Sequence, residues 1–242
     1  MNSPRTKNGA VTMPSFSGRN LEVWRKSEAD AYFRRNRQAL ASLEGSQDDS
    51  VMKLLLPFLR RGDRVVELGC CNGWRVRTLA SRMPELKLTA GLDLSFQALD
   101  DGTKRGSHSL VQADATILPI ASNSVDCVIL GFVCYAIGRR SGMAVLAEVE
   151  RVIREDGVVA ILDFLPDAPA DNSYHHLPSE AIDVIKTDFA DVLVAYGGYQ
   201  RVALSVTPAD GAVPLRSLPG SDRVGVTILQ RHPVPADSFP KE

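Results

Sequence analysis

The sequence predicts an α/β protein built on a doubly wound, mostly parallel sheet of seven strands that ends in an antiparallel pair. Between residues 64 and 165, short apolar runs alternate with segments of helical spacing, which is typical of parallel strands joined by crossover helices. The fourth run, 125–132, is apolar except at Asp126, as expected of a central strand buried on both faces. No helix fits between the last two strands, so these two should pair antiparallel.

Two helices are expected before the first strand. Residues 21–43 carry apolar side chains at helical spacing, among them Trp24, Tyr32 and Leu40, with charged residues on the opposite face. This pattern predicts one amphipathic helix. A second helix is predicted over 49–59, where it ends before the turn signal Arg61-Gly62-Asp63.

The other elements follow in alternation along the chain. Ser95 is a suitable N-cap for the helix that follows the second strand. A partly helical segment over 179–197 precedes the final pair of strands. The predicted strands are 64–69, 87–94, 109–114, 125–132, 158–165, 199–206 and 223–231, and the predicted helices between them are 73–83, 95–106 and 144–153.

Length and composition fit one large domain with short appendages. The 242 residues carry a net charge of −1, which argues against a globally basic nucleic-acid binder. No apolar run reaches the ~20 residues of a membrane span, and the polar start lacks the apolar stretch of a signal peptide, so a soluble, cytoplasmic protein is expected. The predicted divisions are a disordered tail over 1–18, a helical cap over 19–48, the main domain over 49–232 and a tail over 233–242.

The cysteines raise the question of a metal or redox site. The chain has Cys70, Cys71, Cys127 and Cys134, and neither pair has the C-x-x-C spacing or a histidine close in sequence. We therefore expect buried or half-buried thiols in a reducing compartment, and no bound metal.

Small and acidic residues stand where the first three strands end. The first strand runs into Glu67-Leu68-Gly69-Cys70-Cys71-Asn72-Gly73, the second ends at Asp93, and the third ends at Asp114-Ala115. In such sheets ligands bind beyond the carboxyl ends of the strands, so these residues predict one shared site. A dinucleotide loop requires G-x-G-x-x-G, whereas Cys71 takes the second glycine position and no third glycine follows. Asp93 fits ribose recognition, but it does not identify the cofactor by itself.

The combined pattern resembles the class I S-adenosylmethionine (SAM)-dependent methyltransferases, whose first motif is an acidic residue followed by alternating glycines. Glu67-x-Gly69-x-Cys71-x-Gly73 fits that frame, with cysteine at the central glycine position. SAM has no pyrophosphate, so a small side chain there is easier to accommodate. The resemblance covers about residues 50–231, and it implies a Rossmann-like fold with SAM as the cofactor.

A narrower resemblance is to the pseudaminic-acid-biosynthesis-associated methylases. It rests on Trp24, Tyr32 and Arg35-Asn36 in the first helix, and on Lys186-Thr187-Asp188-Phe189-Ala190 after the fifth strand. One position departs from that group, because Ala136 stands where its members tend to carry a histidine. The resemblance implies that the first helix forms a lid over the site.

The resemblance to the methyltransferases also implies roles for the site residues. Glu67 is expected near the charged end of SAM, Asp93 on both ribose hydroxyls, and Asp114 at the adenine. Tyr32 is expected near the sulfonium, where cation–π attraction favours it, and Arg35 at the SAM carboxylate. Structural alternatives stay open, because Asp114 could form an Asx turn and Tyr32 could be a core side chain. The full predicted cofactor set is Tyr32, Arg35, Asn36, Glu67, Gly69, Cys71, Gly73, Asp93, Leu94, Asp114, Ala115 and Phe132.

Candidates for the catalytic base lie mainly in the segment after the fifth strand. His175 and His176 are the first candidates, and Tyr174 and Tyr135 are further ones. Adjacent side chains point apart, so at most one histidine is expected to face the site. A pair of histidines on a surface loop is the equal alternative.

The sequence therefore predicts methyl transfer from SAM to the oxygen or nitrogen of a small-molecule metabolite, in secondary or sugar metabolism. No nucleic-acid or membrane partner is expected, and a homodimer is left open. Three alternatives stay open. They are a cyclase or lyase that acts on SAM itself and releases methylthioadenosine, a non-catalytic SAM-binding module, and a nicotinamide-dependent dehydrogenase.

Overall fold

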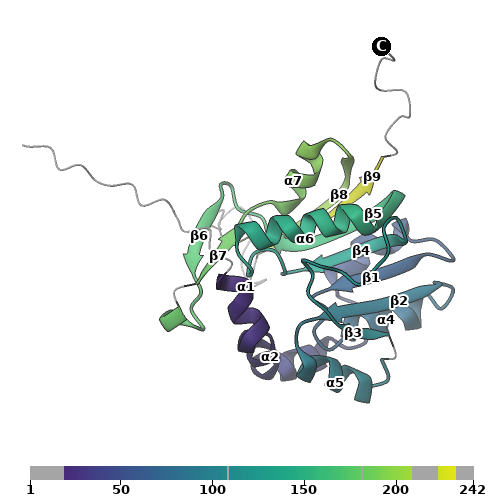
Figure 1. Cartoon of the computed structure of the whole chain (residues 1–242). Coiled ribbons are helices and arrows are strands. Elements are labelled where there is room, and N and C mark those ends of the chain that lie inside the picture. Colours follow the sequence, from purple (N-terminus) through teal and green to yellow (C-terminus); the bar gives the residue numbers. More distant parts are fainter. Residues whose placement is uncertain (1–18, 108, 181, 209–222, 233–242) are drawn as a thin grey trace, which may run out of the picture.

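A seven-stranded sheet forms the centre of the molecule (Figure 1). The structure is a computed structural model that describes residues 19–107, 109–180, 182–208 and 223–232. The tails predicted over 1–18 and 233–242 lie outside the described residues. The strand order is β3-β2-β1-β4-β5-β9-β8, with β9 antiparallel to both of its neighbours and the other pairings parallel. The predicted doubly wound sheet with an antiparallel end is confirmed.

The predicted alternation of strands and helices holds through the central part of the chain. The strands of the main sheet are β1 (Arg64–Leu68), β2 (Leu88–Asp93), β3 (Leu110–Gln112), β4 (Val125–Gly131), β5 (Ile153–Phe164), β8 (Tyr199–Pro208) and β9 (Arg223–Arg231). The helices around it are α3 (Ser50–Leu55), which continues into the 3₁₀ turn η2 (Leu56–Phe58), α4 (Trp74–Arg82), α5 (Phe96–Lys104), α6 (Arg139–Val152) and α7 (Phe189–Tyr196). Ser95 caps α5 as predicted, because its hydroxyl accepts a hydrogen bond from the Ala98 amide at 3.0 Å.

Successive side chains of each strand enter different cores, as the period of two requires. In β4, Val128 and Leu130 belong to the core beneath α6 and α7, which lie in front of the sheet in Figure 1. Cys127 and Ile129 belong to the core that contains side chains of α3 and α4. Burial on both faces explains why the run is continuously apolar after Asp126.

The N-terminal helical segment departs from the single regular helix predicted over 21–43. It consists of α1 (Arg19–Val23), the π-helical turn η1 (Trp24–Glu28) and α2 (Ala29–Leu43), and the Ala29 amide bonds to the Trp24 carbonyl. The prediction of one uniform helix is therefore wrong at this turn. The turn ends at Glu28, whose buried carboxylate binds Tyr174 and Arg35. Such turns occur often at functional sites.

A small second sheet, β6 (Ala170–Ser173) and β7 (Asp183–Lys186), accompanies the main one, with the 3₁₀ turn η3 (Pro178–Glu180) between its strands. The segment predicted as partly helical over 179–197 therefore contains a strand before α7. The Ile185 amide donates to the Tyr135 carbonyl at 2.8 Å, which joins this hairpin to the segment after β4. Figure 1 shows the hairpin beside α1. The N-terminal helix, the hairpin and the segment after β4 thus meet at one edge of the sheet.

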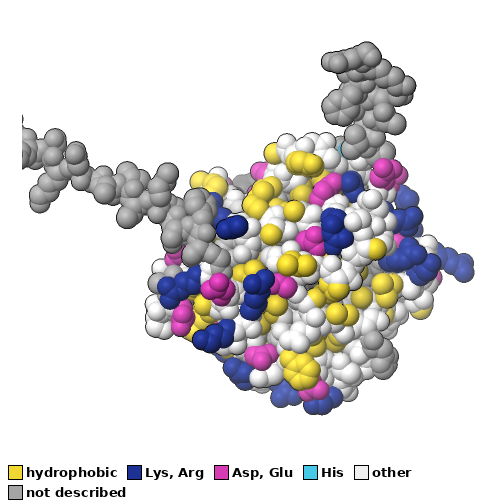
Figure 2. All heavy atoms as spheres, in the orientation of Figure 1, with side chains coloured by type: hydrophobic (Ala, Val, Ile, Leu, Met, Phe, Trp, Pro, Cys, Tyr) yellow, Lys and Arg dark blue, Asp and Glu magenta, His cyan; other side chains and the backbone are white. Residues whose placement is uncertain are grey.

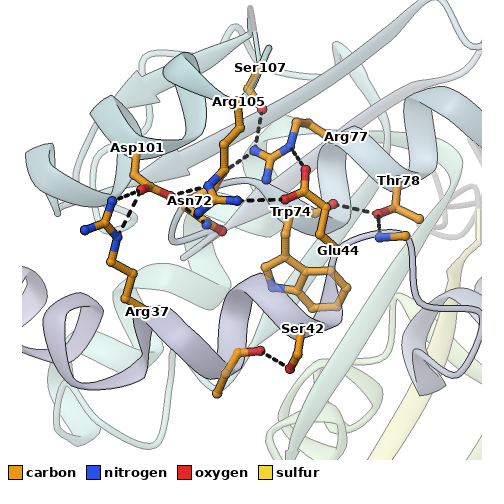
Figure 3. A network of polar contacts seen from close by, with 12 residues as sticks. Arg37, Ser42, Glu44, Asn72, Trp74, Arg77, Thr78, Asp101, Arg105 and Ser107 are labelled. Carbon is orange, nitrogen blue, oxygen red and sulfur yellow. Dashed lines mark hydrogen bonds and ion pairs between the residues drawn. The ribbon is translucent and has the colours of Figure 1, made fainter.

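Polar contacts fasten the C-terminal half of α2 to the main domain (Figure 3). The Arg37 guanidinium donates to Asp101 of α5 at 2.8 Å, and the Asn72 amide donates to the other oxygen of the same carboxylate at 3.1 Å. Glu44, just after α2, accepts from Arg77 of α4 at 2.7 Å. The helix that was expected to form a lid is therefore held in place at both of its ends.

Candidate active site

A cavity of about 360 Å³ lies where β1, β2 and β4 end, and the N-terminal helical segment forms part of its wall. This volume is in the range of small-molecule sites, about 300–1,000 Å³. Several residues predicted from sequence contribute to the wall. They are Tyr32, Glu67, Gly69, Cys71, Asp93, Leu94, Asp114, Ala115, Phe132 and Tyr135.

The loop after β1 turns through left-handed backbone at Gly69 (φ 69°), Cys71 (φ 53°) and Gly73 (φ 67°). Asp93 at the end of β2 holds this loop, because one carboxylate oxygen accepts from the Cys71 amide and the other from the Ser95 amide, both at 2.7 Å. Burial raises the pKa of Asp93, while these backbone donors act in the opposite direction. Each oxygen keeps a second lone pair, so the carboxylate can also accept from a ligand diol.

Replacing Cys71 by glycine is expected to leave SAM affinity within about twofold of wild type. The backbone at this position is left-handed, which glycine adopts at no steric cost, and the Asp93 contact uses only the backbone amide. Calorimetric titration of the variant with SAM measures this directly. A tenfold weaker affinity would show that the thiol side chain contributes to cofactor binding.

Three buried charged side chains lie at one end of the cavity. The Arg75 guanidinium of α4 pairs with Glu67 of β1 and with Asp49, the N-cap of α3, at 3.1–3.2 Å for the Asp49 contacts. One oxygen of Glu67, Oε2, has no hydrogen-bond partner among the described residues. Burial raises the pKa of Glu67 to about 7, although Arg75 opposes the shift. Sequence reasoning missed Arg75 and Asp49. The sequence feature that could have indicated Arg75 is its place on the inward, apolar face of the predicted helix.

SAM affinity is expected to rise about fivefold to tenfold between pH 6 and pH 7.5. The ionised form of Glu67 attracts the cationic end of SAM and the protonated form does not, and a folded-state pKa near 7 places the change in this interval. Titrations at several pH values on wild type and Glu67→Gln provide the measurement. The variant should show a flat profile over the same interval, and an unchanged slope in the variant would exclude Glu67 as the cause.

The opposite end of the cavity is formed by Asp114, Ala115 and Leu94. One oxygen of Asp114 accepts from the amide and hydroxyl of Thr116 at 2.8 and 2.6 Å, so the Asx-turn alternative is present. The other oxygen accepts from Nε of Arg25, which comes from the π turn, at 2.6 Å. Burial works against ionisation here, but the bonds from Thr116 and Arg25 prevail and lower the pKa of Asp114. The N-terminal segment thus also contacts the adenine-side residue.

Arg35 and Asn36 do not line the cavity. Arg35 pairs with Glu28 and donates to the Tyr174 hydroxyl at 3.2 Å, while Tyr174 itself donates to Glu28 at 2.7 Å. The Asn36 amide donates to the Tyr32 carbonyl at 2.9 Å. These contacts fasten the β6–β7 hairpin region to the lid, and the cofactor roles of Arg35 and Asn36 stay predictions.

The catalytic candidates are separated in space. Tyr135 lines the cavity, and burial raises the pKa of its phenol. Tyr174 is buried beneath the lid and lies outside the cavity wall. His175 and His176 are exposed, with ring centroids 3.8 Å apart, and also lie outside it. Gly73, which was predicted to contact the cofactor, is not part of the cavity wall. It is the N-cap of α4, and its cofactor role stays a prediction.

The cavity fits SAM on the chemistry of its wall. Asp93 can accept from a ribose diol, apolar Leu94 and Ala115 can flank a flat base, and the unpartnered Glu67 oxygen suits a cation. Among the described residues no cluster of His, Cys, Asp or Glu could hold a metal ion, and the four cysteines are free thiols.

Comparison with known proteins agrees with this fit. Residues 66–161 match the methyltransferase domain family. No curated protein matches the chain in sequence. Solved methyltransferase structures share its fold. A Burkholderia thailandensis 1,6-didemethyltoxoflavin-N1-methyltransferase, with its substrate and S-adenosylhomocysteine bound, has a TM-score of 0.64 at 13% identity over 96% of this chain and 94% of its own.

Two further structures show the same fold. A Haloferax volcanii putative methyltransferase in complex with the Trm112 activator has a TM-score of 0.60 at 17% identity over 85% of this chain and 98% of its own. A Mesorhizobium loti SAM-dependent methyltransferase has a TM-score of 0.57 at 17% identity over 77% of this chain and 100% of its own. The chain therefore has the fold of these methyltransferases, its residues 66–161 match the methyltransferase domain family, and the wall of its cavity fits SAM as the cofactor.

Proposed function

We propose that the protein transfers the methyl group of SAM to an oxygen or nitrogen atom of a small-molecule metabolite. The observation that supports this is the apolar part of the cavity wall, which includes Tyr135, Ile137 and Leu162, none of them predicted for the cofactor. A wall of this kind suits a compact organic acceptor. The Burkholderia thailandensis structure, whose named substrate is a small heterocycle, supports the same class of acceptor.

The chain contributes positioning in this proposal. SAM supplies an electrophilic methyl group when it is bound. Asp93 and the left-handed loop orient the nucleoside, Glu67 favours the cationic end, and Tyr32 shields the site from water. An acceptor with a free lone pair needs no proton removed beforehand. Such an acceptor suits this site, because His175 and His176 lie outside the cavity wall and Tyr135 stays protonated.

The remaining features of the proposal concern organisation and partners. Residues 19–48 act as the lid and 49–232 as the catalytic domain of a cytoplasmic enzyme of secondary or sugar metabolism. Homodimer formation stays open.

Because the chain resembles the pseudaminic-acid-associated methylases, a sugar is one of the candidate acceptors. Lys and Arg side chains lie beside Asp and Glu side chains over much of the face in Figure 2, which offers nucleic acid no single basic surface. None of the helices in the described ranges is long and apolar enough to cross a membrane.

Incubation of the protein with SAM, with and without a panel of metabolites, tests the proposal by mass spectrometry. S-adenosylhomocysteine that forms only when a metabolite is present, together with a product heavier by one methyl group, is the expected result. Methylthioadenosine formed from SAM alone would contradict methyl transfer and would support a cyclase or lyase. SAM binding without turnover over the whole panel would instead support a non-catalytic module.

A further inference from the structure

Several aromatic side chains line the cavity. Trp24 and Tyr32 come from the N-terminal segment, and their ring centroids are 6.0 Å apart. Phe132 and Tyr135 come from the segment after β4, and theirs are 5.9 Å apart. The cavity therefore has aromatic rings from two separate parts of the chain.

The aromatic pair after β4 is held rigidly. Phe132 has left-handed backbone (φ 54°), an unfavourable conformation for a bulky residue, and its amide donates to the Leu162 carbonyl at 2.8 Å. The Phe164 ring packs behind both side chains, at 5.6 Å from Phe132 and 5.3 Å from Tyr135. Strained residues that their surroundings hold in place are concentrated at ligand sites. The aromatic surface is thus preformed.

The charges around the cavity are mostly negative. Among the described residues that line it, the ionisable acids and bases are Asp49, Glu67, Asp93, Asp114 and Arg75. The single guanidinium, Arg75, is already paired with Glu67 and Asp49. Arg35, near the lid, is paired with Glu28. No cation among these lining residues is unpaired, so a phosphate or carboxylate on the acceptor would find no dedicated partner in the wall, which disfavours it.

We propose that the acceptor is a flat aromatic or heteroaromatic compound, uncharged or cationic, that stacks against these aromatic side chains. This proposal rests on the proposed function, since it names the class of its acceptor. It separates an aromatic metabolite from an acidic or phosphorylated sugar.

Calorimetric titration at saturating S-adenosylhomocysteine tests the proposal with four probes. The flat probes are 1-naphthol and 6-hydroxyquinoline, and the anionic ones are 1-naphthyl phosphate and N-acetylneuraminic acid. At least one flat probe should bind, with an affinity at least tenfold above either anionic probe. An anionic probe that binds as tightly as the flat probes, or the absence of flat-probe binding, would overturn the proposal.

Variants place the probe in the cavity. Tyr135→Ala removes one ring of the cavity wall, so flat-probe affinity should fall about tenfold. Tyr196→Ala, at an exposed tyrosine of α7, is the matched control and should change nothing. Equal effects of Tyr135→Ala and Tyr196→Ala would overturn the proposal. Turnover separates the two failures. The proposed function fails if no acceptor of any class yields a methylated product, whereas this proposal fails alone if methylated product forms only from anionic, non-aromatic acceptors.

Discussion

Replacing Asp93 by alanine is expected to weaken SAM binding by about 100-fold or more. The change removes the acceptor for two ribose hydroxyls, and hydrogen bonds to a charged group contribute roughly 1.5–3 kcal/mol each. It also releases the Cys71 amide, so the left-handed loop loses one of its anchors. Calorimetric titration with SAM and with S-adenosylhomocysteine measures the loss, which should be similar for both because they share the ribose.

Asp100→Ala is the matched control for this experiment. Asp100 is an aspartate of α5 whose carboxylate pairs with Lys104 near the surface, outside the cavity wall. The control should bind SAM as wild type does. If Asp93→Ala also retains wild-type affinity while remaining folded, the ribose assignment is wrong.

Replacing Arg75 by methionine is expected to lower the free energy of unfolding by about 3–5 kcal/mol. Arg75, Glu67 and Asp49 are nearly inaccessible to solvent, and removing one member of a buried ion pair leaves uncompensated charge in the interior. Here two carboxylates lose their partner at once. Urea unfolding followed by circular dichroism at neutral pH gives the difference.

Two further variants make the Arg75 result interpretable. The triple change Arg75→Met, Glu67→Gln and Asp49→Asn should recover part of the lost stability, because neutral amides replace the unpaired carboxylates. Arg60→Met, at an exposed arginine, should alter stability by less than about 0.5 kcal/mol. No recovery in the triple variant would show that shape rather than charge determines the role of Arg75.

The sheet and the cofactor end of the site follow from local patterns. Alternating periodicity predicts the parallel strands, and the residues at strand ends identify Gly69, Asp93 and Asp114, because topology brings the carboxyl ends of these strands together. The residues that determine this part of the site lie close to the elements that position them. For that reason, the sequence alone was enough to predict that Gly69, Asp93 and Asp114 share one site.

The lid and the acceptor side depend on contacts between distant segments. The π turn ends at Glu28, which meets Tyr174, 146 positions away, and no periodic pattern marks such a contact. The same contact holds Arg35 beside the hairpin, outside the cavity wall. Arg75 lines the cavity, but from sequence it reads as one more charged residue of an amphipathic helix. The β6–β7 hairpin is short and partly polar, so its strands carry little sequence signal.

Calorimetric titration of the protein with SAM and, separately, with NAD⁺ tests the central claim most directly. One SAM bound per chain, with no detectable heat from NAD⁺, is the predicted result, because the loop after β1 carries Cys71 where a pyrophosphate requires glycine. Binding of NAD⁺ without binding of SAM would contradict both the cofactor assignment and the methyl transfer proposed from it.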